Sequence, residues 1–350
     1  TGEDTLSLHD ALPISGTTLQ VDGATAPGVF AGGTANVSGG VTVNLLSLPA
    51  VAGPIRVLEF GGSLVGTAAN FTLANASTYR SPTFAVASNE VTLTLGAAAD
   101  LTWTGTGGSD WDIGTTTNWN NSAPSPSSFY NGDNVTFGNS GGGTIGVAAN
   151  VGAGNLVIDS NDNWLFQGSG IVAASSVTKS GTGTATFETP VNFPGPISLG
   201  SGVLKLSPST ATTLAGAISG AGTLAKAGTG PLTISAANTA FTGTVVIANG
   251  ELVPAHSNAL GTAAKITFGD ASTLPADIST LSLNTGVTLA APQIQVSATA
   301  IDARISGIGG AMSDATITKR GTGKLTIGHP TDYTQTAAYL TGNSSIVIEK

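Results

Sequence analysis

The chain contains no cysteine, and charged and aromatic residues make up only 9% and 5% of its 350 positions. An exported chain that must avoid premature disulfides would show this absence, and so would a chain of simply cysteine-poor composition. The formal net charge is −9, and no basic run or stripe is present, which argues against nucleic acid as a partner. No apolar run approaches the roughly 20 residues of a membrane-spanning helix, so we predict no membrane insertion by this segment.

Glycine, in contrast, occupies 49 positions, and threonine is about as frequent. Glycine and β-branched residues are poor helix formers, and together they favour many short strands joined by tight turns. The hydrophobic share of 40% and the mildly positive mean hydropathy argue against disorder, which needs few apolar residues and high charge. Composition therefore predicts an all-β protein with a core of small aliphatic side chains.

Three segments, residues 177–187, 224–234 and 317–327, share the pattern apolar-x-Lys-x-Gly-Thr-Gly-x-apolar-Thr-apolar. Their spacings are about 47 residues and then about 93, nearly twice the first. Repeats of this length are typical of stacked solenoid folds, and about 47 residues would make two turns of roughly 20–25 residues each. We predict a parallel β-helix, or β-solenoid, built from degenerate repeats of about 47 residues and stacked in register.

Within each copy, the apolar residues should point inward and the threonine outward, and the glycine pair should supply positive φ for the turn. The lysine should lay its stem along apolar surface and place its ammonium group in solvent. A missing copy is expected near residues 274–287, where the alternation survives but the Gly-Thr-Gly turn does not. Tyr333 stands where another second-half copy should begin.

Four segments differ in character. Residues 1–15 resemble the translated read-through of a sequencing adapter, so we expect them to be non-biological. Residues 16–100 are interpreted as the tail of a preceding β-repeat unit, residues 101–166 as the Trp-rich opening block of a new unit, and residues 167–350 as the β-solenoid array. We expect the chain to be an internal fragment of a longer protein.

The repeat resembles that of the autotransporter-associated β-strand repeat proteins, also described as carrying passenger-associated transport repeats. The resemblance is carried by Lys-x-Gly-Thr-Gly-x-Leu-Thr-Ile at 226–234, by the segment from Asn238 to Leu252, and by Asn118-Trp119 and Gly-Asp-x-Val-x-Phe at 132–137. It implies an exported Gram-negative passenger at the cell surface, outer-membrane-associated or extracellular. It also implies a translocator barrel outside this chain.

On this basis we expect a non-catalytic structural passenger, a stiff stalk or adhesin-like solenoid, whose candidate partners are surface glycans or other cells. The sequence shows no catalytic, cofactor-binding or metal-binding set, and we predict none of these. His256 and His329 have no second ligand at metal-binding spacing, so we interpret them as surface-loop residues.

The alternative is a carbohydrate-binding or carbohydrate-active module in the Trp-rich block. Asp110, Asp112 and Asp133, with Asp159 and Asp162 nearby, could supply the paired carboxylates of glycoside hydrolysis, and tryptophans could form a sugar platform. In the structural interpretation, the aspartates occupy turns and the tryptophans fill a core. Exposed, coplanar Trp111 and Trp119 would favour the module, whereas buried rings would count against it.

Overall fold

The computed structural model describes residues 12–22, 30–47, 53–121, 127–140, 142–262, 264–274, 277–296, 302–307, 309–320, 323–328 and 340–348. These residues are almost entirely strand and turn, and their parallel sheets form a β-solenoid of about 13 turns, which confirms the predicted fold class. The chain divides into two compact units. Unit 1 is Thr1–Ala99 with Tyr130–Asp133, and unit 2 is Asp100–Phe129 with Asn134–Lys350.

Unit 1 has three small sheets, and its strands follow one another from sheet to sheet in chain order. Two of the sheets are parallel, whereas the third ends in an antiparallel hairpin. Their strands are β1 (Leu12–Pro13), β4 (Ala35–Asn36) and β7 (Leu64–Val65); β2 (Thr17–Asp22), β5 (Val41–Ser47) and β8 (Phe71–Leu73); and β3 (Phe30–Ala31), β6 (Ile55–Phe60), β10 (Glu90–Thr94) and β9 (Thr83–Ala87). The short 3-10 helices η1 (Ala68–Asn70) and η2 (Ala76–Thr78) lie between β7 and β9.

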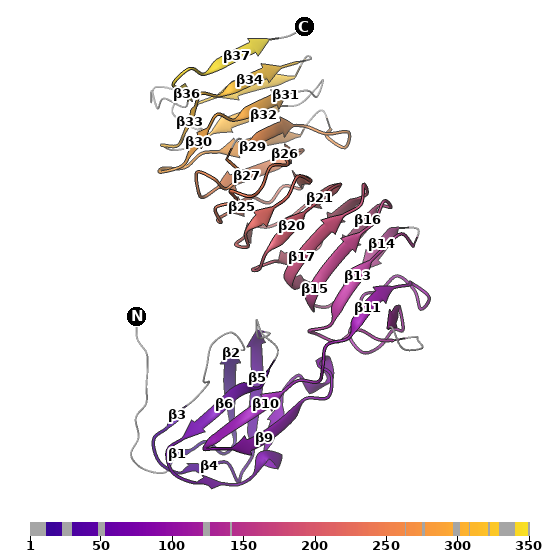
Figure 1. The fold of residues 1–350 in the computed structure, drawn as a ribbon, viewed down its shortest axis with the longest axis vertical. Helices are drawn as coiled ribbons and strands as arrows, with labels where there is room; N and C mark the ends of the chain where they lie inside the picture. Colours follow the sequence, from indigo (N-terminus) through magenta and orange to yellow (C-terminus); the bar gives the residue numbers. More distant parts are fainter. Residues whose placement is uncertain are drawn as a thin grey trace. The chain divides into compact units, whose positions relative to one another are not determined.

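Two long sheets dominate unit 2, and their strands lie one above the next in Figure 1. We name the first of them the opening sheet, and it contains β12 (Trp119–Asn121), β11 (Asp100–Trp103), β13 (Asn134–Phe137), β15 (Val151–Asp159), β17 (Val172–Ser180), β20 (Ile197–Leu199) and β23 (Ile218–Ser219), with β19 (Val191–Asn192) beside β17. We name the second the long sheet, and it contains β14 (Gly143–Gly146), β16 (Trp164–Gln167), β18 (Thr184–Phe187), β21 (Val203–Leu206), β24 (Thr223–Lys226), β26 (Thr244–Ile247), β28 (Lys265–Phe268), β31 (Gln293–Val296), β34 (Thr316–Lys319) and β37 (Ser345–Ile348).

Two further sheets complete the later turns of unit 2. The third sheet contains β22 (Thr212–Leu214), β25 (Leu232–Ile234), β27 (Gly250–Pro254), β29 (Ile278–Ser282), β32 (Asp302–Ser306) and β35 (Lys324–Ile327). The fourth contains β30 (Thr288–Ala290), β33 (Ala311–Ser313) and β36 (Leu340–Thr341). Every pairing in these two sheets and in the long sheet is parallel. Each lap of the chain is therefore hydrogen-bonded to the lap below, as in a solenoid.

The second and third copies of the repeat lie in register, as predicted. Lys226 and Lys319 occupy one column of the long sheet and are joined through Ile247, Phe268 and Val296. The step of about 93 residues therefore spans four turns of the coil. The second strands of these copies, β25 and β35, likewise share the third sheet.

The first copy does not share this register. Its lysine, Lys179, lies in the opening sheet, and its final residue, Phe187, lies in the column of Lys226, two strands below it. The prediction that all three copies stack is thus wrong for the first copy. Its first strand lies in the opening sheet and its second in the long sheet, whereas the other two copies use the long sheet and the third sheet. The reason is the turn length. Successive turns here place paired residues about 20 apart, as in Phe187 and Leu206, so a step of about 47 residues overshoots two turns.

The two glycines of the second copy, Gly228 and Gly230, serve different needs. Gly228 has φ of +70°, a conformation that L side chains adopt at a cost, so it makes the predicted turn. Gly230 does not have positive φ, but a Cβ placed there would lie 2.4 Å from the carbonyl oxygen of Thr210 in the turn below. The second glycine is therefore required by close stacking of successive turns, and not by the turn conformation that we predicted.

The degenerate copy also appears in the structure. β28 lies two strands above β24 in the long sheet, and Phe268 takes the position that Lys226 has in its own copy. β29 then enters the third sheet with Leu281 paired to Leu252, so the strand continues although the Gly-Thr-Gly turn is gone. The Tyr333 copy lies outside the described residues, as do residues 1–11 of the suspected adapter segment.

Candidate functional site

The carboxylates that could have formed a glycosidase pair have separate structural contacts. Asp112 Oδ1 accepts hydrogen bonds from the backbone N–H and hydroxyl of Thr116, at 2.9 and 3.0 Å, and so fixes its own loop. Asp159 accepts the hydroxyl of Ser180 at 2.7 Å on the next turn. Asp110 is exposed at a bridge to Gly146, and Asp162 is half-buried. Asp112 and Asp159 therefore hold their own loop and the next turn, and neither of these contacts joins two of the aspartates.

Asp133 forms a buried ion pair within unit 1. Its two oxygens accept from Nε and a terminal nitrogen of Arg80, at 2.7 and 2.9 Å, and from the backbone N–H groups of Ala99 and Tyr130. The Arg80 guanidinium carbon lies 4.8 Å from the centre of the Tyr130 ring. Because Asp133 is only 1% exposed, these contacts compensate its desolvation, and the carboxylate has a structural role.

The tryptophans form a core. Trp103, Trp111, Trp119 and Trp164 are all at most 5% exposed. Trp111 and Trp119 meet at 67° with ring centres 5.6 Å apart, an edge-to-face contact of the kind that fills interiors. The interpretation of these rings as an exposed, coplanar sugar platform is therefore wrong, and the interpretation as core filling is confirmed.

The repeat lysines are buried, which sequence reasoning missed. Lys179 and Lys226 have no measurable exposure. Lys226 Nζ donates to the carbonyl oxygens of Ala227, Gly228 and Asn249 at 2.6, 2.7 and 2.9 Å. Lys179 Nζ contacts the matching carbonyls of Ser180 and Gly181. The predicted solvent-exposed ammonium is wrong, because the turn curls its carbonyls inward and leaves them in need of donors.

Burial perturbs these ammonium groups. Desolvation lowers the pKa of Lys226 to about 8, and the nearby charge of Glu251 opposes the shift. Desolvation also lowers the pKa of Lys179, with Asp159 opposing. A perturbed lysine can mark a catalytic site. Here all three donors of Lys226 are used by turn carbonyls, so the geometry indicates a structural clamp that ties one turn to the next.

A shallow groove of about 470 Å³ lies on the outer face of the opening sheet. Residues of β11, β12, β13 and β15 line it, and the polar ones are Asp100, Thr102, Asn120, Asn121, Asn134, Thr136 and Asn155. The sequence analysis did not predict these residues as a site, because their residue types also occur in ordinary turns and solvent-facing strand positions. The alternation within β11 and β13 would have indicated which side chains face outward.

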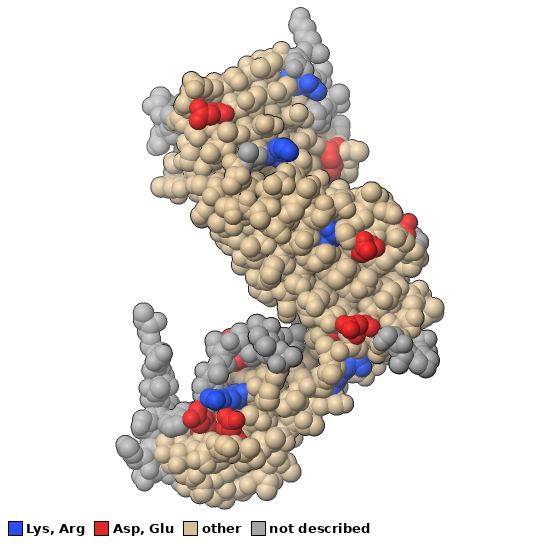
Figure 2. Space-filling model, viewed as in Figure 1, with Lys and Arg blue, Asp and Glu red and all other residues tan. Residues whose placement is uncertain are grey.

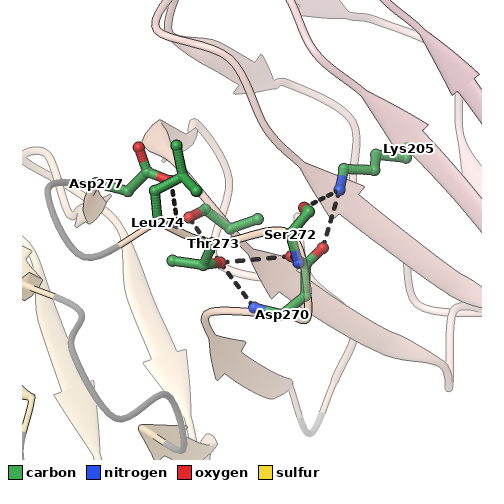
Figure 3. A network of polar contacts seen from close by, with 7 residues as sticks. Lys205, Asp270, Ser272, Thr273, Leu274 and Asp277 are labelled. Atoms are coloured by element: carbon green, nitrogen blue, oxygen red, sulfur yellow. Dashed lines mark hydrogen bonds and ion pairs between the residues drawn. The ribbon is translucent and has the colours of Figure 1, made fainter.

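A second polar network fastens the loop that replaces the lost Gly-Thr-Gly turn. Figure 3 shows Lys205, on β21, reaching Asp270 and Ser272, with Nζ to oxygen distances of 3.0 and 2.6 Å. Thr273 donates to the carbonyl of Ala248, and Asn249 donates to Asp277. The loop after β28 is therefore held against strands that lie below it in the stack.

Few of the described side chains are grouped in a way that could bind a metal ion. The part of the chain that the structure describes contains no group of three or more His, Asp or Glu residues placed to hold a metal ion. Figure 2 shows acidic and basic side chains as small isolated groups on the face in view. His256 is exposed in a loop and accepts the N–H of Asn258, whereas His329 lies outside the described residues.

Within the described ranges, no helix is both long and apolar enough to span a membrane.

The fold and these contacts define the class of protein. It is a β-solenoid in which buried lysines, side-chain hydrogen bonds and an aromatic core hold successive turns together. Comparisons of the chain with protein-family models, with curated proteins and with solved structures found no match in any of the three. Its function must therefore be argued from its own residues.

Proposed function

We propose that this chain is a non-catalytic structural segment of an exported bacterial surface protein, a stiff stalk or adhesin-like β-solenoid. The observation that carries the proposal is the ten-stranded parallel long sheet of unit 2. Its hydrogen bonds run between successive turns, so they resist separation of the turns. The export route and the autotransporter-like identity rest on the repeat resemblance alone.

The use of the chemically active side chains supports a structural role. The buried lysines clamp turns, Asp133 pairs with Arg80, and the tryptophans pack against phenylalanines. Phe166 and Phe187 stack in adjacent turns with ring centres 4.4 Å apart. These side chains stabilise contacts inside the fold, which supports a structural role for them.

Asparagine side chains, one exposed and one buried, add further links between turns. Asn161 Oδ1 accepts the N–H and hydroxyl of Thr182 at 2.9 and 3.1 Å, one turn later in the coil. Asn238, which is buried, accepts the N–H of Ile218 and donates to the carbonyl of Ala259 at 2.7 and 2.6 Å, and so joins three turns. Each link acts along the direction in which a stalk would be loaded.

Mechanical unfolding of the full chain by optical tweezers tests the stalk. A solenoid held at its ends should yield in small steps, each releasing about one turn, or roughly 70 Å of chain for some 21 residues. A single cooperative rupture of unit 2 would contradict the proposal.

Two further assays test the other parts of the proposal. If the chain is not catalytic, the protein should release no reducing ends from a panel of polysaccharides, and release above the blank would overturn this part. Protease shaving of intact producing cells should remove the chain, and its protection there would contradict surface display.

A further inference from the structure

The groove on the opening sheet has a composition that points to a ligand. Its polar side chains are a single carboxylate, amides and threonine hydroxyls, contributed by three neighbouring parallel strands and by β12. β12 pairs antiparallel to β11 and places Asn120 opposite Thr102. The groove thus collects side chains that both donate and accept hydrogen bonds.

Several of these groups are held in place by one another. Asn134 Nδ2 donates to Asp100 Oδ1 at 2.8 Å, and Asn134 Oδ1 accepts the backbone N–H of Asn155 at 3.0 Å. Asn155 Oδ1 in turn accepts the hydroxyl of Ser176 at 2.6 Å. The column is therefore fixed before any ligand arrives, which reduces the entropy cost of binding.

This column keeps hydrogen-bonding capacity for a ligand. A carboxylate offers about four acceptor positions and an amide offers two N–H donors. Among the described residues, the Asp100 carboxylate meets one side-chain donor, and the Asn155 N–H₂ group meets none. The open acceptor positions of Asp100 and the N–H₂ donors of Asn155 therefore lie two strands apart, roughly 10 Å at the usual spacing between strands.

The lining selects a chemical class. Among the described residues that line the groove there is no lysine, arginine or histidine, so these residues supply none of the cations that would bind phosphate or an acidic polymer. Its apolar lining, from Leu101, Val135 and Val157, is interrupted by polar side chains, so it offers a lipid chain no continuous apolar surface. Vicinal hydroxyls donate and accept at once and match amides and a carboxylate. We propose that the groove over β11, β12, β13 and β15 binds an uncharged oligosaccharide. This site is separate from the buried tryptophans and does not depend on the proposed surface location.

Affinity electrophoresis of the full chain in gels that contain neutral polysaccharides (mannan, xyloglucan, mixed-linkage β-glucan) tests the proposal, with polygalacturonate as the acidic comparison. The test variants are N120L and N155L, which alter side chains exposed in the groove. N192L is the matched control, because Asn192 is exposed on β19 of the same sheet but outside the groove.

At least one neutral polysaccharide should retard the wild type, and each groove variant should weaken this retardation at least tenfold while N192L leaves it unchanged. Binding should persist in EDTA. The proposal is overturned if no neutral polymer retards the wild type, if only polygalacturonate does, if EDTA abolishes binding, or if a variant with wild-type melting temperature binds as the wild type does. Because N120L and N155L change different strands, misfolding of one leaves the other as a test.

Discussion

Replacement of Lys226 by methionine tests whether the repeat lysine is a clamp. Methionine keeps most of the buried stem but removes three hydrogen bonds from the ammonium group to the carbonyls of Ala227, Gly228 and Asn249. Hydrogen bonds that involve a charged group contribute roughly 1.5–3 kcal/mol each, so their loss costs on the order of 5–9 kcal/mol. The substitution also removes the cost of burying the charge.

That cost follows from the pKa of Lys226, which burial lowers from 10.5 to about 8. At about 1.4 kcal/mol per pKa unit, burying the charged ammonium group costs the folded state roughly 3 kcal/mol. The hydrogen bonds outweigh this cost, so K226M should destabilise unit 2 by roughly 2–6 kcal/mol at pH 7. For a domain of this size, such a loss lowers the melting temperature by roughly 4–24 °C.

The pH dependence gives a second measurement. Below pH 8, Lys226 is protonated in both the folded and the unfolded state, so the folded state bears the full free-energy cost of burying the charge. Between pH 8 and 10.5 only the unfolded state keeps the proton, so the stability contributed by Lys226 rises with pH. The difference in stability between wild type and K226M should therefore widen by up to roughly 3 kcal/mol over this window.

Thermal melts followed by circular dichroism at pH 7 and pH 10 provide the assay. K265M is the matched control, because Lys265 is exposed on β28 of the same sheet and should melt as the wild type does. If K226M melts with the wild type at pH 7, and the difference does not change by pH 10, the clamp is refuted.

Three further outcomes are expected. G183A should destabilise unit 2 strongly, because its new Cβ would lie 2.1 Å from a backbone carbonyl of the turn below, whereas G138A, with no atom within 4 Å, should melt nearly as the wild type does. D133N should expose unit 1 to limited proteolysis, since it weakens a buried ion pair at a cost of about 3 kcal/mol, whereas exposed Asp110 changed to Asn should not. Tryptophan emission should be blue-shifted and resist acrylamide, because the indoles are buried; ready quenching would contradict the aromatic core.

Much of the fold could be predicted from local pattern. The alternation in Leu232-Thr233-Ile234 sets which side chains face inward, and the structure buries the two apolar residues and leaves Thr233 only partly covered. This works because side-chain direction in a strand depends only on neighbouring positions. The strand of the missing copy was predicted for the same reason, since burial in β29 alternates as far as Leu281 although the turn is lost and Ser282 is also buried.

The candidate site was less predictable. Trp111 and Asp110 are close in sequence and both belong to residue types that bind sugars, but one is buried and the other exposed. Which of them meets solvent depends on the aromatic rings that arrive from later turns, such as Phe137 and Phe166. The groove has the same origin, because Asp100, Asn134 and Asn155 are adjacent only once three turns are stacked.

The sequence by itself thus determined that the chain coils, how its strands alternate, and about how many residues each turn takes, because each of these follows from short-range periodicity and from glycine at tight turns. Tertiary structure alone decided which side of the coil each copy occupies, because small differences in turn length accumulate along the chain. It also decided that Lys179 and Lys226 lie inside, since the inward carbonyls that bind their ammonium groups exist only when the turn has formed.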